Sequence, residues 1–409
     1  MMPRMTTARR VVVTGMGVIA GPGNTRATFW DALRNGCSAI RPMTLAPEGS
    51  LRFANGAEVA DFNAAVSLDV KDADLLDRFA QFALIAAREA VADAGVQITP
   101  ERGERIGVVT GTSAGGKTSE DREFHSLYGE GSGRVHPLTI ARTMANAGTS
   151  RIAQEYGITG PSYTVSTACA SAAHAIGQAF WMVRHGMLDA AIAGGSEAPF
   201  SLGFLKAWEA MRIVAPDTCR PFSRDRKGLI LGEGAAMLVL EPLDEARARG
   251  AHIWGEIAGF GMSSDAHHLT QPLAAGAARA MKAAFGDAGV EPAEIGYINA
   301  HGTGTVANDA TEAQAIHEVF GARAARIPVS STKSMHGHAL GAAGALEAAA
   351  TLLALHEGVI PPTANFTEAD PACALDVVPN VARETSAEWA LSNSFAFGGL
   401  NAVLAMRKI

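Results

Sequence analysis

Hydrophobic residues follow two alternating patterns along this chain. Short apolar runs rich in β-branched residues predict strands at 11–14, 106–110, 163–166, 190–193, 236–240, 295–299, 328–330 and 402–406. Longer alanine- and leucine-rich runs predict helices at 75–94, 174–184, 277–288, 310–320 and 340–356. Strands that alternate with helices in this way predict a mostly parallel sheet covered by helices.

The strand pattern divides near the middle of the chain. The first series of strands ends near Glu241, and the second begins with a further strand at about 253–260. The glycine-rich stretch TGMGVIAG at 14–21 follows a strand, as a dinucleotide-binding loop would. Pro22 and Gly23 come after it in place of a helix, so we expect no nucleotide there.

Composition narrows the class of protein. The 409 residues are 48% hydrophobic and 18% charged, which suits a well-buried enzyme that forms oligomers. The net charge of −7, without a basic stripe, argues against a nucleic-acid partner. The apolar stretch 339–355 contains Glu347 and predicts a buried helix, so we expect no membrane association.

The spacing of the cysteines and the sequence at the start of the chain indicate in which cellular compartment the protein is expected. The cysteines are widely scattered, with no paired spacing: Cys37, Cys169, Cys219 and Cys373. We therefore expect neither a disulfide framework nor structural zinc, and a cytoplasmic location fits. The apolar run that follows MMPRMTTARR is short and broken by glycine, unlike that of a signal peptide.

Cys169 is the candidate nucleophile. It lies where the apolar run 163–166 gives way to an alanine-rich helical run, so its sulfur is expected at a helix N-terminus, which favours a thiolate. Its small neighbours leave room for a bulky acyl group. The alternative interpretation is a small buried core cysteine.

Two histidines are candidates to bind a carbonyl oxygen. His301 ends an apolar strand and opens a Gly-Thr-Gly-Thr loop, so its ring is expected to point into a cavity at the sheet edge. His338 precedes a helix that starts near 340, where the helix dipole disfavours protonation. Neutral imidazoles can donate a hydrogen bond to a developing oxyanion. A Cys-His-His metal site is the alternative, but it lacks local ligand pairing and a fourth candidate.

Three stretches of sequence belong together. STACASA around Cys169, NAHGTGT around His301, and KSMHGHALGAAG around Lys333 and His338 resemble the Cys-His-His motifs of the β-ketoacyl-acyl carrier protein synthases of the thiolase superfamily. Four more stretches extend the resemblance over nearly the whole chain: VVVTGMGVIAGPGN, LILGEGAAMLVLE, GMSSDAHHLTQP and NSFAFGGLN. The sequence looks most similar to the synthase II branch and to stand-alone polyketide ketosynthases.

The resemblance implies an α/β fold. Two thiolase-like βαβαβαββ halves would form a five-layered αβαβα sandwich. The half that carries the nucleophilic cysteine would span 1–250, and the half that carries both histidines would span 251–409.

The resemblance also implies a three-step reaction. An acyl chain transfers from a carrier protein to Cys169, malonyl-carrier protein loses carbon dioxide while His301 and His338 hold its thioester oxygen, and the carbanion attacks the acyl-enzyme. The backbone N–H groups of Cys169 and Phe397 would form an oxyanion hole, with Phe395 in the same gate segment. No external cofactor is expected, because phosphopantetheine arrives on the carrier protein.

Further positions match family residues around the reacting groups. Lys333 and Glu347 match residues that orient the histidines, with a purely structural ion pair as the alternative. Family members often hold a monovalent cation near residues that match Asn299, Ala300, Glu347, Ser392 and Asn393.

The sequence departs from the family at the acyl pocket and at its gate. Ala114 stands where elongating synthases commonly carry a bulky apolar residue at the acyl pocket, which predicts a deeper pocket. Ala396 replaces the first glycine of the usual GFGG loop, which predicts a less mobile Phe397 gate.

A third departure concerns the carrier-protein docking surface. Asp72 and Asp74 stand where family members place basic residues to dock the acidic carrier protein. We expect weaker electrostatic steering there. Other basic residues could compensate: Lys206, Arg212, Arg134 or Arg142.

These observations together predict a cytoplasmic, homodimeric β-ketoacyl-acyl carrier protein synthase that catalyses decarboxylative Claisen condensation in fatty-acid elongation. The alternative is a specialised ketosynthase for polyenes or polyketides, paired with a chain-length-factor-like subunit as a heterodimer. A degradative thiolase is a distant alternative, because it needs a second cysteine as base and no other cysteine lies in a matching motif.

Overall fold

Two blocks of five strands, arranged alike, form the centre of the computed structural model, which describes residues 8–47 and 49–409. The first block contains β1 (Val11–Ala20), β4 (Ile106–Gly111), β5 (Ser162–Val165), β6 (Ala190–Glu197) and β7 (Gly234–Pro242). The second contains β8 (Gly255–Ser264), β9 (Ile295–Asn299), β10 (Pro328–Ser330), β14 (Trp389–Ala396) and β15 (Leu400–Arg407).

The two blocks share one topology. Their strand orders are β5-β4-β6-β7-β1 and β10-β9-β14-β15-β8. In each block the first three strands run parallel and the last two join antiparallel. The blocks meet where Val11–Val13 of β1 pair with 255–257 of β8, and β12 (Asp376–Val377) extends the outer edge of β10. The result is one eleven-stranded mixed sheet.

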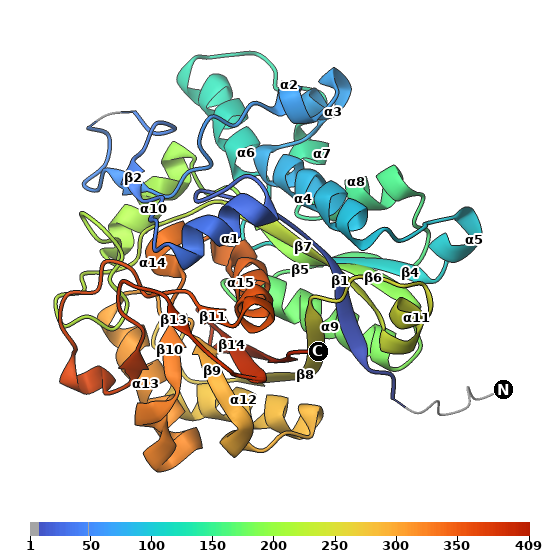
Figure 1. The fold of residues 1–409 in the computed structure, drawn as a ribbon. Coiled ribbons are helices and arrows are strands. Elements are labelled where there is room, and N and C mark those ends of the chain that lie inside the picture. Colours follow the sequence, from blue (N-terminus) through green and yellow to red (C-terminus); the bar gives the residue numbers. More distant parts are fainter. Residues whose placement is uncertain (1–7, 48) are drawn as a thin grey trace.

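Helices cover both blocks and separate them. The central helices α9 (Ser171–Arg184) and α15 (Ala343–Glu357) contact strands of both blocks. The first block is covered on its outer side by α4 (Arg78–Ala94) and α8 (Ala147–Tyr156), and the second by α12 (Ala274–Ala288) and α13 (Val306–Phe320). Figure 1 shows α4 above the sheet and α12 and α13 below it. This layering confirms the predicted five-layered thiolase-like sandwich.

The remaining elements lie outside the five layers of this sandwich. The helices are α1 (Arg26–Arg34), α2 (Ala64–Ser67), α3 (Val70–Leu75), α5 (Pro100–Gly103), α6 (Lys117–Phe124), α7 (Thr139–Thr143), α10 (Leu202–Met211), α11 (Leu243–Ala248) and α14 (Lys333–His336). Two small two-stranded sheets pair β2 (Arg41–Pro42) with β3 (Asn55–Gly56), and β11 (Val359–Ile360) with β13 (Arg383–Glu384).

Residues with small side chains allow the helices to pack closely against the strands. Every residue of α15 from Ala343 to Leu355 is buried, as expected for a helix between two sheets. The TGMGVIAG stretch is part of β1, not a nucleotide loop: a Cβ on Gly17 would lie 2.0 Å from the carbonyl oxygen of Ala86 in α4. The glycines of β1 therefore serve close helix-to-strand packing.

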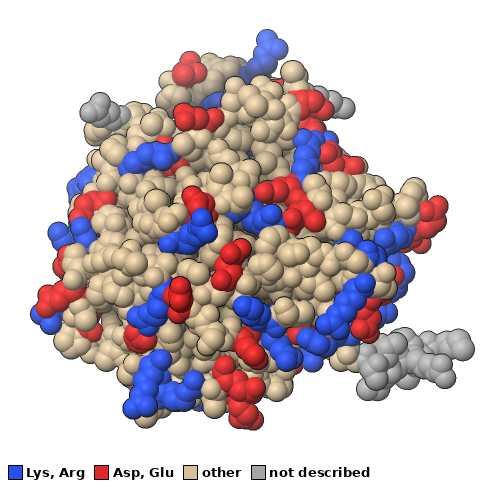
Figure 2. Space-filling model, in the orientation of Figure 1, with Lys and Arg blue, Asp and Glu red and all other residues tan. Residues whose placement is uncertain are grey.

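The surface carries both signs of charge. On the face drawn in Figure 2, Lys and Arg side chains alternate with Asp and Glu side chains over the described residues. Of the helices in the described part of the chain, none is long and apolar enough to cross a membrane.

Candidate active site

A sharp turn presents Cys169 between β5 and α9. The strand ends at Val165 and the helix starts at Ser171, as the sequence predicts. Ala168 adopts φ of 48°, a left-handed conformation that costs a non-glycine residue about 1–3 kcal/mol. The Ser171 hydroxyl holds this turn: it donates to the Ala168 carbonyl at 2.6 Å and accepts the Thr167 N–H at 2.9 Å.

The resting form of Cys169 differs from the sequence prediction. Burial raises the pKa of its thiol to about 11, although Lys333 and the Phe397 N–H, which donates to the sulfur, lower it. Burial is the largest cause of the raised pKa, and it opposes the thiolate expected at the helix N-terminus. The thiol must lose its proton when substrate is bound.

Both predicted histidines face Cys169 across one cavity. The rings of His301 and His338 meet edge to face, with centroids 5.4 Å apart and planes at 83°. With Cys169 they line a cavity of about 430 Å³, to which Phe395 and Phe397 also contribute. Among the described residues that line it, Cys169 is the sole cysteine, so the structure brings no second thiol of the thiolase kind to this cavity.

Lys333 fixes the orientation of the His301 ring. Its ammonium group contacts His301 Nδ1 at 3.2 Å, donates to the His301 carbonyl at 2.7 Å and pairs with Glu347 Oε1. These contacts use all three ammonium hydrogens, and the acceptor role of Nδ1 leaves the ring proton on Nε2. His301 therefore presents an N–H donor to the cavity.

Burial keeps both imidazoles neutral. It lowers the pKa of His301 and of His338 well below the usual value, and the charge of Lys333 lowers both further. A neutral imidazole can donate to an oxyanion without itself carrying the charge.

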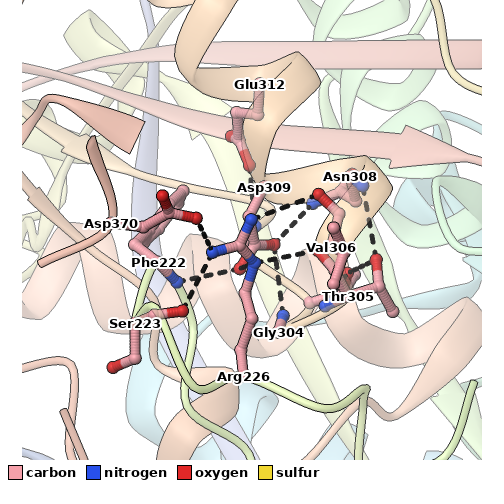
Figure 3. A network of polar contacts seen from close by, with 12 residues as sticks. Phe222, Ser223, Arg226, Gly304, Thr305, Val306, Asn308, Asp309, Glu312 and Asp370 are labelled. Carbon is pink, nitrogen blue, oxygen red and sulfur yellow. Dashed lines mark hydrogen bonds and ion pairs between the residues drawn. The ribbon is translucent and has the colours of Figure 1, made fainter. Parts of the chain in front are cut away.

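A buried polar network, drawn in Figure 3, holds the loop that follows His301. Glu312 of α13 accepts the N–H groups of His301 and Gly302, both at 2.8 Å. Asp309, one turn earlier on α13, accepts the N–H groups of Gly304 at 3.2 Å and Phe222 at 2.8 Å.

Arg226 closes this network from the other side. It pairs with Asp309 at 3.6 Å and with Asp370, and it donates to the carbonyl of Thr305 at 3.4 Å. Sequence analysis did not single out Arg226, Asp309 or Glu312. The i, i+3 spacing of two acidic residues in a helix that opens directly after NAHGTGT was the available signal.

Phe397 lines the cavity and packs against Trp208. Its ring stacks on Trp208, with centroids 6.3 Å apart and planes at 22°. The next residue, Gly398, donates its N–H to the Leu269 carbonyl at 2.7 Å, and Gly398 and Gly399 have positive φ angles of 84° and 69°. The left-handed conformations in this segment thus fall on Gly398 and Gly399, and Ala396 precedes them at the end of β14. The effect of Ala396 on the mobility of Phe397 stays a prediction.

Comparisons with known proteins decide the family. Residues 8–246 match the Beta-ketoacyl synthase, N-terminal domain family, and residues 254–367 match the corresponding C-terminal domain family. The chain belongs to the β-ketoacyl synthases. It is accordingly an acyl-transferring condensing enzyme.

Relatives within the family differ in their named roles. The chain is 47% identical over 401 residues to nodulation protein E of Rhizobium sp. (strain N33), covering 98% of this chain and 100% of that protein. It is 40% identical over 411 residues to 3-oxoacyl-[acyl-carrier-protein] synthase 2 of Staphylococcus aureus (strain COL), covering 99% of each.

Solved ketosynthases have the same fold. The ishigamide ketosynthase/chain length factor superimposes with a TM-score of 0.93 at 40% identity, covering 98% of this chain and 100% of that one. A type II polyketide-synthase ketosynthase, solved with its acyl carrier protein and bound to the hexaketide, superimposes with a TM-score of 0.90 at 32% identity over 98% and 100%.

The residues of the predicted cation site lie on neighbouring elements, because Ser392 of β14 pairs in register with Asn299 of β9 and each is followed by a further predicted residue, Asn393 and Ala300. Asn299 donates to the backbone carbonyl of Glu347 at 3.4 Å, whereas Asn393 donates to Glu312 at 3.1 Å. Asn299 Oδ1, Glu347 Oε2, Asn393 Oδ1 and Ser394 Oγ are buried without a hydrogen-bond partner. Within 8–47 and 49–409, no three His, Cys, Asp or Glu side chains are arranged to hold a metal ion.

Ala114 lies outside the lining of the active-site cavity. It sits in the loop after β4, where its N–H donates to Glu197 at 3.2 Å. Its role in an acyl pocket stays a prediction.

The two aspartates of the docking region are not equivalent. Asp72 is buried and accepts two hydrogen bonds from Arg151, at 2.8 and 2.7 Å, so it does not present the free surface charge that the sequence suggested. Asp74 keeps 68% of its side chain exposed and pairs with Arg142. Arg142 is itself buried and donates to the backbone carbonyl of Asp74 at 2.8 Å, which removes it from the candidate docking residues.

Proposed function

We propose that this ketosynthase condenses an acyl chain, carried on Cys169, with malonyl-acyl carrier protein in fatty-acid elongation. The observation that carries the proposal is the shared cavity of Cys169, His301 and His338. A nucleophile and two neutral hydrogen-bond donors within one enclosed space meet the needs of thioester condensation.

The reaction divides into a transfer and a condensation. Cys169 attacks the acyl thioester, its proton passes to the departing thiolate of the carrier protein, and an acyl-enzyme remains. The malonyl carboxylate then leaves as carbon dioxide, and its electron pair forms an enolate on the thioester oxygen, held by the N–H of His301 and by His338. The enolate carbon attacks the acyl-enzyme, and the released Cys169 thiolate takes up a proton.

Side chains at the cavity mouth suit a carrier protein with an acidic surface. Arg212 and Lys227 are exposed and line the cavity. Two exposed apolar side chains, Leu269 and Val306, lie beside them with 74% and 64% of their surfaces exposed. An apolar centre with basic neighbours complements a phosphopantetheine arm delivered by an acidic protein.

A specialised elongation role is the second candidate. Its support is the similarity to nodulation protein E and to the ishigamide ketosynthase/chain length factor.

One experiment separates these candidates. The purified protein, alone, is incubated with malonyl-carrier protein and a panel of saturated and polyunsaturated acyl-carrier proteins, and products are read by intact mass. Elongation of saturated chains supports fatty-acid synthesis, and elongation of polyunsaturated primers alone supports the specialised role. Acylation of Cys169 without condensation would indicate a missing partner subunit, and no acylation would refute the proposal.

A monovalent cation is proposed as a structural ligand rather than a reactant. Asn299 Oδ1 and Glu347 Oε2 are buried oxygens without partners, and such oxygens suit a cation. A bound cation would supply charge compensation behind Lys333. No external redox or metal cofactor is required by the proposed steps.

We also propose that the ketosynthase forms a dimer through the outer edge of β5. This strand ends the sheet, α8 packs beside it, and α7 contacts α8. Ile140 of α7 exposes 78% of its surface. An unpaired strand edge beside apolar side chains is suited to a second copy of this chain.

A further inference from the structure

Glu197 is a buried carboxylate that the proposed reaction does not use. It is the last residue of β6, and its exposed fraction is 0%. Of the groups in the described residues, none forms an ion pair with it within 4.0 Å; its hydrogen-bond donors are hydroxyl and backbone N–H groups. Burying a carboxylate without an ion-pair partner costs free energy, so hydrogen bonds to both of its oxygens must compensate for the lost water.

The donors come from two segments far apart in sequence. Glu197 Oε1 accepts the Thr112 hydroxyl at 2.9 Å and the Ala114 N–H at 3.2 Å. Glu197 Oε2 accepts the Ser113 N–H at 2.7 Å and its hydroxyl at 2.6 Å. The same oxygen accepts the Gly341 N–H at 2.9 Å. One carboxylate thus joins the loop after β4 to the turn that follows His338.

The turn after His338 needs such support. Leu340 has φ of 44°, a left-handed conformation that an L-residue keeps only when its surroundings impose it. Gly341 approaches the other segment closely, because a Cβ there would lie 2.3 Å from Ser113 N and 2.6 Å from Glu197 Oε2. On its other side, His338 is held by backbone bonds with Ile230 at 2.6 Å and Gly232 at 3.0 Å.

We propose that Glu197 is a positioning residue for the condensation, which fixes the turn after His338 and the Thr112–Ala114 loop in one arrangement. The inference rests on the proposed function, since His338 is assigned there to the thioester oxygen. The loop that carries Ala114 therefore cannot shift without disturbing the turn that positions His338.

The test compares Glu197→Gln with Glu241→Gln. Glu241 is also buried in this sheet, where it accepts the Thr14 hydroxyl at 2.6 Å, but it lies at the far end of β7, roughly 23 Å along the strand. In Glu197→Gln, one carboxylate oxygen that accepts hydrogen bonds is replaced by an NH2 group. This NH2 group would face backbone N–H and hydroxyl donors and could not accept from them. We expect condensation kcat to fall about tenfold to hundredfold in Glu197→Gln, with little change in KM for malonyl-carrier protein. Glu241→Gln should leave kcat unchanged.

Hydrogen exchange provides a readout that does not depend on turnover. In Glu197→Gln, amide exchange should accelerate in peptides that cover 112–114 and 340–342, and not in Glu241→Gln. Ser113→Ala removes one donor and should give a smaller change of the same kind, which keeps the test available if Glu197→Gln fails to fold. Unchanged exchange in both segments, or a folded Glu197→Gln with wild-type kcat, would overturn the inference. A wild-type protein that acylates no cysteine would instead refute the proposed function.

Discussion

At the scale of single residues, Lys333 has both a chemical role and a structural role, and each depends on a different contact. Its three ammonium hydrogens meet His301 Nδ1, the His301 carbonyl and Glu347. The first contact sets the tautomer of His301, and the third neutralises a buried carboxylate. These two effects can be dissected by mutation.

Lys333→Met should both destabilise the ketosynthase and slow condensation. Loss of the cation leaves Glu347 buried without its charge partner, which costs about 3–5 kcal/mol in the free energy of unfolding. The double variant Lys333→Met/Glu347→Gln should regain most of this stability but keep condensation at least about tenfold below wild type, because His301 is still unoriented. Thermal unfolding and product formation measure the two effects, and recovery of both would show that the pair is only structural.

His336 should make stability depend on pH. Burial lowers its pKa to about 3, with a further contribution from Lys333, so it stays neutral in the folded protein when the unfolded chain protonates it near its usual pKa of about 6.5. The unfolded state then binds more protons, and this contribution to stability is lost as pH falls below about 6.5. Between pH 7 and pH 5, wild type should lose about 2 kcal/mol more than His336→Gln. Denaturant unfolding at both pH values measures this, and parallel losses would contradict it.

At the scale of elements, the layers approach closely because helices place glycine where a strand side chain would otherwise collide. Gly177 lies in the central helix α9, where a Cβ would fall 2.3 Å from the Phe260 ring of β8. Gly286 lies in the outer helix α12, where a Cβ would meet nothing within 4 Å. Replacing the glycine by alanine should therefore change the free energy of unfolding in opposite directions in the two helices.

Gly177→Ala should destabilise the protein by about 1–3 kcal/mol, because the added methyl group forces α9 away from Phe260. Gly286→Ala should stabilise it by about 0.5–1 kcal/mol, because alanine loses less backbone entropy in a helix. Denaturant titration of the matched pair measures both free energies of unfolding. Equal effects would contradict the close approach of α9 and β8.

At the scale of the whole molecule, the proposed dimer depends on the outer edge of β5. Ile140, in α7, exposes 78% of its surface on that side. Val381 is comparably exposed, at 75%, in the segment between β12 and β13. A negative charge can therefore be introduced at Ile140, inside the proposed interface, and at Val381, outside it, as a matched control.

Ile140→Asp should convert the dimer to a monomer, since a buried unpaired carboxylate opposes association, whereas Val381→Asp should leave the dimer intact. Light scattering coupled to size-exclusion chromatography reports the mass. A monomeric wild-type protein, or a dimeric Ile140→Asp, would contradict the proposed interface.

The sequence by itself determined most elements and the candidate reacting residues. The predicted helices and strands correspond to α4, α9, α12, α13 and α15 and to nine of the ten strands of the two blocks, because apolar periodicity reports which face of an element is buried. Cys169, His301 and His338 stand out in the sequence because each lies at a junction of elements within a motif that resembles the family, and the structure places all three around one cavity. Strand β14 was missed as a strand: its buried Ser392, Asn393 and Ser394 give it the polarity of a loop.

Only the tertiary structure decided which distant residues act together. The contacts of Glu197 with Ser113 and Gly341, and of Phe397 with Trp208, join residues from separate parts of the chain, and no local pattern encodes them. The burial of Cys169 was decided in the same way. A helix N-terminus can be read from sequence, but the desolvation that raises the pKa of this thiol arises from all the layers packed around it.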